Sequence, residues 1–121
     1  MKTKLEDVHK LLLSKGFTVY DYNTDYSSVY YAFGDIGFCL FLLTDIQHNE
    51  ISRISYYEMI PVNISNVVSF RRSKRIDEYD PTIKSIAREL KKYIPMLYEA
   101  SRLGKEMRVK IKIDEIGEDF K

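Results

Sequence analysis

The residues of clearest chemical interest form one short basic segment with an aromatic neighbour: Phe70, Arg71, Arg72, Lys74 and Arg75. Guanidinium and ammonium groups bind phosphates and displace counterions from a polyanion, and Phe70 could stack on a base. This segment is therefore a candidate site for nucleic acid or another anion. The alternative is a solvated turn whose charge is balanced by Asp77, Glu78 and Asp80. Because short basic runs are common in proteins, we prefer the solvated turn at this stage.

Tyrosine is the second unusual feature, because the chain has ten tyrosines and no tryptophan. Four of them form two adjacent pairs, Tyr30 with Tyr31 and Tyr56 with Tyr57. Neighbouring residues of a strand point to opposite faces of a sheet, so one member of each pair must face away from any covering helices. A tyrosine tolerates that position because its ring packs while its hydroxyl stays in water. These four residues are candidate protein-interface residues, and ordinary cross-strand pairing of aromatic rings is the alternative.

Catalytic and metal-binding motifs do not stand out in this sequence. Asp45, His48 and Glu50 carry donors that metals accept, but no second group of such donors lies nearby, so we expect a polar loop and no metal. Cys39 has apolar neighbours, which favours a buried thiol without a catalytic role. The sequence has no glycine-rich phosphate loop and no nucleophile elbow. We therefore expect neither a cofactor nor a catalytic residue.

Length, charge and cysteine content limit the class of protein. With 121 residues the chain is the size of one domain, 1–121, and we expect residues 114–121 to be a frayed polar tail. The net charge of +1 argues against a dedicated binder of polyanions. One cysteine, a polar N-terminus and no apolar run near the roughly 20 residues that span a bilayer predict a cytoplasmic protein, in a cell or in the host of a virus.

The first half of the sequence predicts a helix followed by a meander of strands. Thr3 and Glu6 match a capping box, and apolar residues then recur at helical spacing, which predicts a helix over 3–15. Segments rich in β-formers, separated by turn residues, predict four strands, the last of which ends at Pro61 because proline cannot continue a ladder. These strands are expected at 17–22, 28–33, 38–44 and 51–60. Their short connections favour antiparallel pairing.

The second half is less uniform. Residues 62–77 fit either a short helix or one more strand. Asp80 and Pro81 are typical of a helix start, and Pro95 predicts a kink in the long helix that follows, or two abutting helices. The alternation from Met107 to Ile113 predicts a final strand at a sheet edge. The expected fold is thus α+β, with an antiparallel four- to five-stranded sheet, an N-terminal helix, a Pro-kinked C-terminal helix mainly on one face, and a C-terminal strand.

Three classes of function remain, and no family motif separates them. The leading hypothesis is a non-enzymatic binding module that acts through protein–protein contact as a homodimer, because helices on one side of a sheet leave apolar and tyrosine-rich surface uncovered. The residue usage is also compatible with a viral or mobile-element inhibitor of a host protein. The second hypothesis is a nucleic-acid-binding protein that uses residues 70–75. An enzyme with a site assembled from distant residues ranks last.

Overall fold

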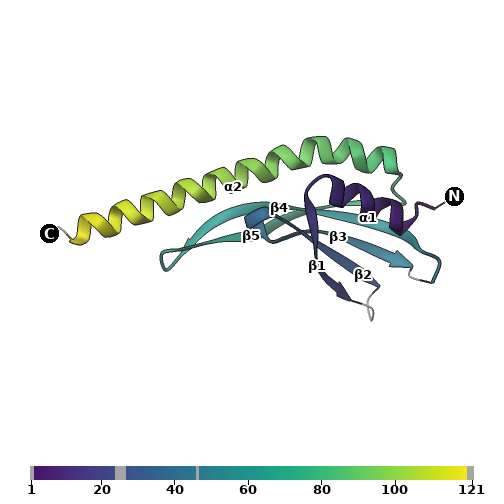
Figure 1. Cartoon of the computed structure of the whole chain (residues 1–121), viewed down its shortest axis with the longest axis horizontal. Coiled ribbons are helices and arrows are strands. Elements are labelled where there is room, and N and C mark those ends of the chain that lie inside the picture. The colour runs from purple at the N-terminus through teal and green to yellow at the C-terminus, as the bar shows by residue number, and fades with distance from the viewer. Residues whose placement is uncertain (1, 24–26, 46, 120–121) are drawn as a thin grey trace.

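The computed structural model of the chain describes residues 2–23, 27–45 and 47–119. These residues form an open antiparallel sheet whose five strands are neighbours in chain order, with both helices on one side of it (Figure 1). In chain order the elements are α1 (Leu5–Ser14), β1 (Phe17–Asn23), β2 (Ser28–Phe33), the 3-10 turn η1 (Gly34–Ile36), β3 (Phe38–Asp45), β4 (Glu50–Ile64), β5 (Val67–Tyr79) and α2 (Ile83–Asp119). The expected α+β meander is confirmed.

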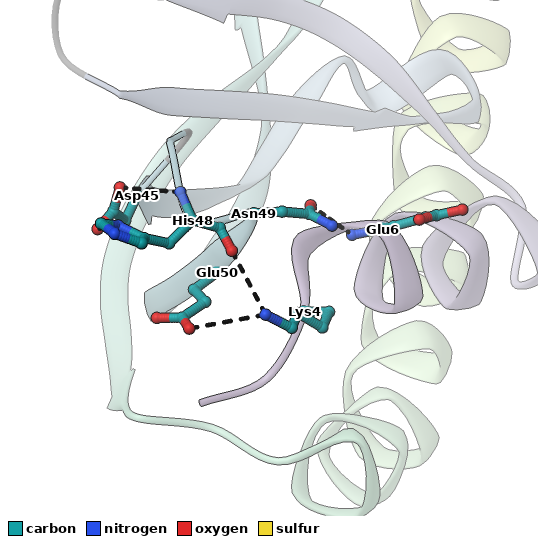
Figure 2. A network of polar contacts seen from close by, with 6 residues as sticks. All are labelled: Lys4, Glu6, Asp45, His48, Asn49 and Glu50. Carbon is teal, nitrogen blue, oxygen red and sulfur yellow. Dashed lines mark hydrogen bonds and ion pairs between the residues drawn. The ribbon is translucent and has the colours of Figure 1, made fainter. Parts of the chain in front are cut away.

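Helix α1 is shorter than the helix predicted over 3–15, and the predicted capping box between Thr3 and Glu6 does not form. Asn49, from the connection between β3 and β4, caps the helix instead. Its backbone carbonyl accepts from the Leu5 amide at 2.9 Å. Its side-chain oxygen accepts from the Glu6 amide at 3.3 Å (Figure 2). The free amides of the first helical turn thus have a partner that is distant in sequence, which a local motif cannot reveal.

The predicted strand end at Pro61 is wrong, because β4 continues to Ile64. Pro61 lies opposite Phe70 of β5, whereas the pairing of β4 with β3 covers only residues 50–56 of β4. Beyond that stretch β4 has a strand on one side only. Proline is tolerated there because its missing N–H can fall on the unpaired side of the strand.

The ambiguous region 62–77 contains the end of β4 and most of β5, so the alternative of a helix is wrong. A two-residue turn reverses the chain at Ser65 and Asn66, whose φ angles are +52° and +64°. Two successive positive φ angles are typical of the hairpin turn that matches the twist of its strands. The Asn63 side-chain oxygen accepts from the Asn66 amide at 3.0 Å and so helps to close this turn.

Helix α2 is one continuous, gently bowed helix that runs beyond the strands at its C-terminal end (Figure 1). It begins after Thr82, whose hydroxyl accepts from the Ser85 amide at 3.0 Å, and not at Asp80 as predicted. Pro95 lies inside it without dividing it.

The predicted C-terminal strand is wrong, because residues 107–113 are helical. So are residues 114–119 of the expected frayed tail, while 120–121 lie outside the described residues. Val109, Ile113 and Ile116 have helical spacing, whereas Val109, Ile111 and Ile113 alternate as in a strand, so the pattern alone could not decide.

The core lies between the two helices and the face of the sheet beneath them. Val8 and Leu12 of α1 and Ile86, Leu90 and Leu97 of α2 are buried against strand residues. The strand side chains of this layer are Val29, Tyr31, Leu40, Leu42, Ile54 and Tyr56. Farther along α2, Gly104 permits close contact with the β4–β5 hairpin, because a Cβ there would lie 2.7 Å from the Phe70 ring.

Candidate binding surface on the open face of the sheet

The pleat of the sheet separates the two adjacent tyrosine pairs. Tyr31 and Tyr56 lie beneath the helices and are 0% and 4% exposed. Tyr31 contacts His9 of α1, and Tyr56 packs against Tyr93 of α2 with ring centroids 5.1 Å apart. Their neighbours Tyr30 and Tyr57 therefore point to the opposite face, which we call the open face.

A continuous cluster of aromatic rings lies on the open face and includes residues of four strands. Phe38 is its centre: its ring centroid is 4.9 Å from Tyr30, 5.5 Å from Tyr57 and 5.9 Å from Tyr20. Phe41 lies against Tyr30 and Tyr57 at 5.7 and 6.1 Å. We call Tyr20, Tyr30, Phe38, Phe41 and Tyr57 the aromatic cluster. Rings of neighbouring strands therefore pack against each other, as the alternative of ordinary cross-strand pairing predicted. The cluster also presents ring surface to solvent, because Tyr20 is 63% exposed.

Arginines extend this cluster toward β5. The Arg53 guanidinium lies between the rings of Phe41 and Tyr79, 5.4 and 5.9 Å from their centroids. The Arg72 guanidinium lies 4.7 Å from the Phe38 centroid. Such contacts hold a cation over a ring face and leave other guanidinium N–H groups able to donate.

Two carboxylates partly neutralise the positive charge of the open face. Asp77 pairs with Arg75 at 3.1 Å and accepts from the Ser55 hydroxyl at 2.6 Å. Asp21 lies opposite Tyr30 in the β1–β2 register, so it shares the open face. Arg53, Arg72 and Arg75 outnumber these two carboxylates, so the net charge of the five residues is positive. Arg71 and Lys74 of β5 are also exposed.

The structure divides the residues that the sequence suggested. Arg72 of the basic segment joins the aromatic cluster, whereas Phe70 packs against α2 at Gly104 and is not placed to stack on a base. The segment is part of a strand and not the solvated turn that we preferred. Tyr30 and Tyr57 lie on the open face, but Tyr31 and Tyr56 are core residues and present no side chain at a surface.

Five residues of the open face were not predicted: Tyr20, Phe38, Phe41, Arg53 and Tyr79. Strand alternation alone would have suggested that Tyr57 and Arg53 share a face, since they are four residues apart in one strand. Grouping them with residues of other strands needs the pairing register. That register shifts in each of the four strand pairs, and a shift of one residue exchanges the faces.

The candidate metal-binding loop is held by a network of polar contacts, in which Lys4 donates to the His48 carbonyl at 3.4 Å (Figure 2). Asp45 binds His48 at 2.7 Å, and Glu50 pairs with Lys4 at 3.7 Å. The hydrogen bond from His48 lowers the pKa of Asp45. Among the described residues no group of three metal-ligating side chains occurs here or elsewhere.

The Cys39 thiol is fully buried, as its apolar neighbours predicted. Burial raises its pKa to about 12, although a hydrogen bond with Tyr93 acts in the opposite direction. A thiol that stays protonated is a poor nucleophile.

Two further findings concern the chain as a whole. Neither α1 nor α2, over the described residues, combines the length and the apolar character needed to cross a membrane. A comparison of the chain with protein-family models, with curated proteins and with solved structures gives no match.

Proposed function

We propose that the chain is a non-enzymatic binding module and that its open face binds single-stranded nucleic acid. The observation that carries this proposal is the aromatic cluster, continued by arginines to β5, on the face that lacks a helix. Aromatic rings beside a positively charged track form the usual platform for single strands, because every base has a face that can stack.

The two ends of the surface offer the most accessible rings. Tyr20 on β1 is 63% exposed and Tyr79 on β5 is 68% exposed. Four strand spacings of about 4.8 Å separate β1 from β5, so the platform is roughly 19 Å wide. Bases stacked on these rings must be unpaired, which favours a single strand over a duplex.

Phosphate contacts come from the arginines of the same face. Arg53 and Arg72 lie over rings, where they can donate to phosphate oxygens on either side of a stacked base. The Arg75 guanidinium is already paired with the Asp77 carboxylate. The near-neutral net charge is compatible with this arrangement, because about three contacts suffice for salt-dependent binding.

The test is a fluorescence anisotropy titration with a labelled 12-nucleotide oligothymidylate, the corresponding RNA and a duplex of equal length. We expect the single strands to bind more tightly than the duplex. With about three phosphate contacts, the affinity should fall roughly 100-fold for a tenfold rise in salt, following the slope of about −0.7 per contact for single strands.

Two pairs of variants assign the binding to the open face. Tyr20→Ala combined with Tyr79→Ala should weaken binding at least tenfold, since each stacked base contributes about 1–3 kcal/mol. Tyr98→Ala, on α2 and 63% exposed, is the matched control. Arg72→Gln should reduce the salt slope, and Arg88→Gln on α2 should not. Absence of binding at low salt, or equal effects of Tyr98→Ala and the double variant, would refute the proposal.

A protein partner at the same face, with a second copy of the chain as the simplest case, is the second candidate. It is favoured by the combination of tyrosine, phenylalanine and arginine, which is typical of the centres of protein interfaces. Sedimentation velocity over a range of concentrations distinguishes the two. If the wild type forms a dimer, the double variant is monomeric and no oligonucleotide binds, the second candidate replaces the first.

A further inference from the structure

A bulge at the β1 end of the open face changes where two neighbouring side chains point. Tyr20 is an extra residue of β1 between the paired positions Val19 and Asp21. Bulges re-aim the side chains beside them and are common next to functional sites. The flanking residues Val19 and Tyr22 both line a hollow between α1 and the sheet face beneath the helices. The two residues between them, Tyr20 and Asp21, therefore share the open face, whereas neighbours in a regular strand point to opposite faces.

Tyr20 and Asp21 combine a stacking ring with a hydrogen-bond acceptor. The Tyr20 ring is 63% exposed and lies nearly parallel to that of Phe38, at an interplanar angle of 21°. Asp21 is also exposed, and one of its carboxylate oxygens accepts from the Tyr22 amide at 2.8 Å. Within the described part of the chain Asp21 forms no ion pair. Its carboxylate is thus oriented by the backbone and retains acceptor capacity for a ligand.

Asp21 lies far from the arginines that would bind phosphate. Arg53 and Arg72 belong to β4 and β5, and three strand spacings, roughly 14 Å, separate β1 from β4. That distance exceeds the Debye length of about 8 Å at physiological ionic strength, so the charge of Asp21 is largely screened from these cations. A carboxylate also repels phosphate. The chemistry that suits it on a stacking surface is a base with hydrogen-bond donors at its edge.

We propose that the β1 end of the open face selects guanine, an inference that rests on the proposed binding of single strands. A guanine stacked on Tyr20 presents two adjacent donors, N1–H and the N2 amino group, to the Asp21 carboxylate. A carboxylate only accepts, so it matches two neighbouring donors. The other bases place an acceptor beside the donor on the same edge: N3 in cytosine, N1 in adenine and carbonyl oxygens in thymine and uracil. Those acceptors repel the carboxylate.

The test compares two labelled dodecamers by fluorescence anisotropy at one salt concentration: oligothymidylate, and the same strand with a single central guanine. We expect the guanine strand to bind about fivefold more tightly, at the lower end of what a bidentate pair to a base contributes. Inosine, which lacks the N2 amino group, should lie between the two, and 7-deazaguanine, which keeps both donors, should match guanine. Equal affinity of the two dodecamers would refute guanine selection alone. If neither strand binds at low salt, the proposed function fails as well.

Asp21→Asn tests whether the carboxylate is the selecting group. The change removes a charge that repels phosphate, so the affinity for oligothymidylate should stay the same or rise up to about twofold, while the preference for guanine should disappear. Asp114→Asn, at an exposed carboxylate of α2, is the matched control and should change neither value. A preference that persists in Asp21→Asn would overturn the assignment. So would an equal loss of affinity for both dodecamers, because a merely structural role of Asp21 predicts that result.

Discussion

The two faces of the sheet use the same residue type for different purposes. On the covered face, tyrosines are buried and some of their hydroxyls bond inside the protein. The Tyr31 hydroxyl lies 2.8 Å from His9, and the Tyr93 hydroxyl lies 2.8 and 2.6 Å from the carbonyl oxygens of Cys39 and Tyr57. On the open face, Tyr30 and Tyr57 pack against other rings at the surface. Adjacent tyrosines such as Tyr30 and Tyr31 thus have different roles, one at the surface and the other in the core.

This contrast separates stability from binding. The covered face owes its form to helices that remove its side chains from water, so its residues should govern folding. The aromatic cluster of the open face is held by the sheet alone, and its outermost rings make few contacts. Changes on the covered face should therefore alter unfolding, whereas changes at the margin of the open face should alter binding.

The largest expected effect tests the first tyrosine pair. Tyr31→Ala should lower the free energy of unfolding by about 3–5 kcal/mol, because it opens a cavity beneath α1. Tyr30→Ala should cost clearly less, since the Tyr30 ring is only partly buried. Urea unfolding followed by circular dichroism measures both. Equal losses would show that the open-face cluster is as much a core as the covered face.

The next effect concerns the contact of α2 with the hairpin. Gly104→Ala should cost about 1–3 kcal/mol, because the new Cβ would lie 2.7 Å from the Phe70 ring. Combining Gly104→Ala with Phe70→Leu should cost less than the sum of the two single changes, since the smaller side chain relieves the clash. Gly117→Ala, where a Cβ meets nothing within 4 Å, is the control. Additive losses in the same urea experiment would contradict this contact.

Most of this architecture could be predicted from sequence, because β1 to β3 are short segments with clear boundaries. Gly16, directly after the predicted helix, has a φ of +99°, a conformation that glycine adopts easily and that is typical of a helix end. Errors arose where tertiary contacts override local signals. Asn49 replaces the capping box of α1, and Pro61 is tolerated because β4 has a free side.

The candidate site was less accessible to prediction than the fold. Alternation correctly implied that the tyrosine pairs divide between two faces, but it could not say which member is covered. That assignment depends on where the helices pack. Phe70 illustrates the limit: its basic neighbours suggested a stacking role, yet contact with Gly104 of α2 withdraws it from the open face.

A smaller effect appears at alkaline pH and also belongs to the covered face. Burial raises the pKa of Tyr31 from 10.0 to about 12 and that of Cys39 from 9.0 to about 12. In both cases the folded state holds the proton more tightly than the unfolded state. Their contribution to stability is therefore complete below about pH 9 and is lost as the pH rises toward 12. Urea midpoints at pH 8 and pH 11 should show the decline.

The control for this pH effect is Tyr31→Phe, which cannot ionise at that position. Its stability should be lower than that of the wild type at pH 8, because the contact with His9 is lost. The difference between the two proteins should narrow at pH 11. A constant difference would mean that Tyr31 ionises equally in both states.

The smallest expected effect gives the sharpest test of the division between the faces. Tyr79 is 68% exposed, and its ring lies beside the Arg53 guanidinium, so Tyr79→Ala should change the free energy of unfolding by no more than about 0.5 kcal/mol. The same change should weaken oligonucleotide binding, because it removes an exposed stacking surface at one end of the platform. Urea unfolding and anisotropy on one preparation give both values. A loss of stability with unchanged binding would reverse the roles of the two faces, because Tyr79 would then serve the fold and the stacking platform would have to lie elsewhere.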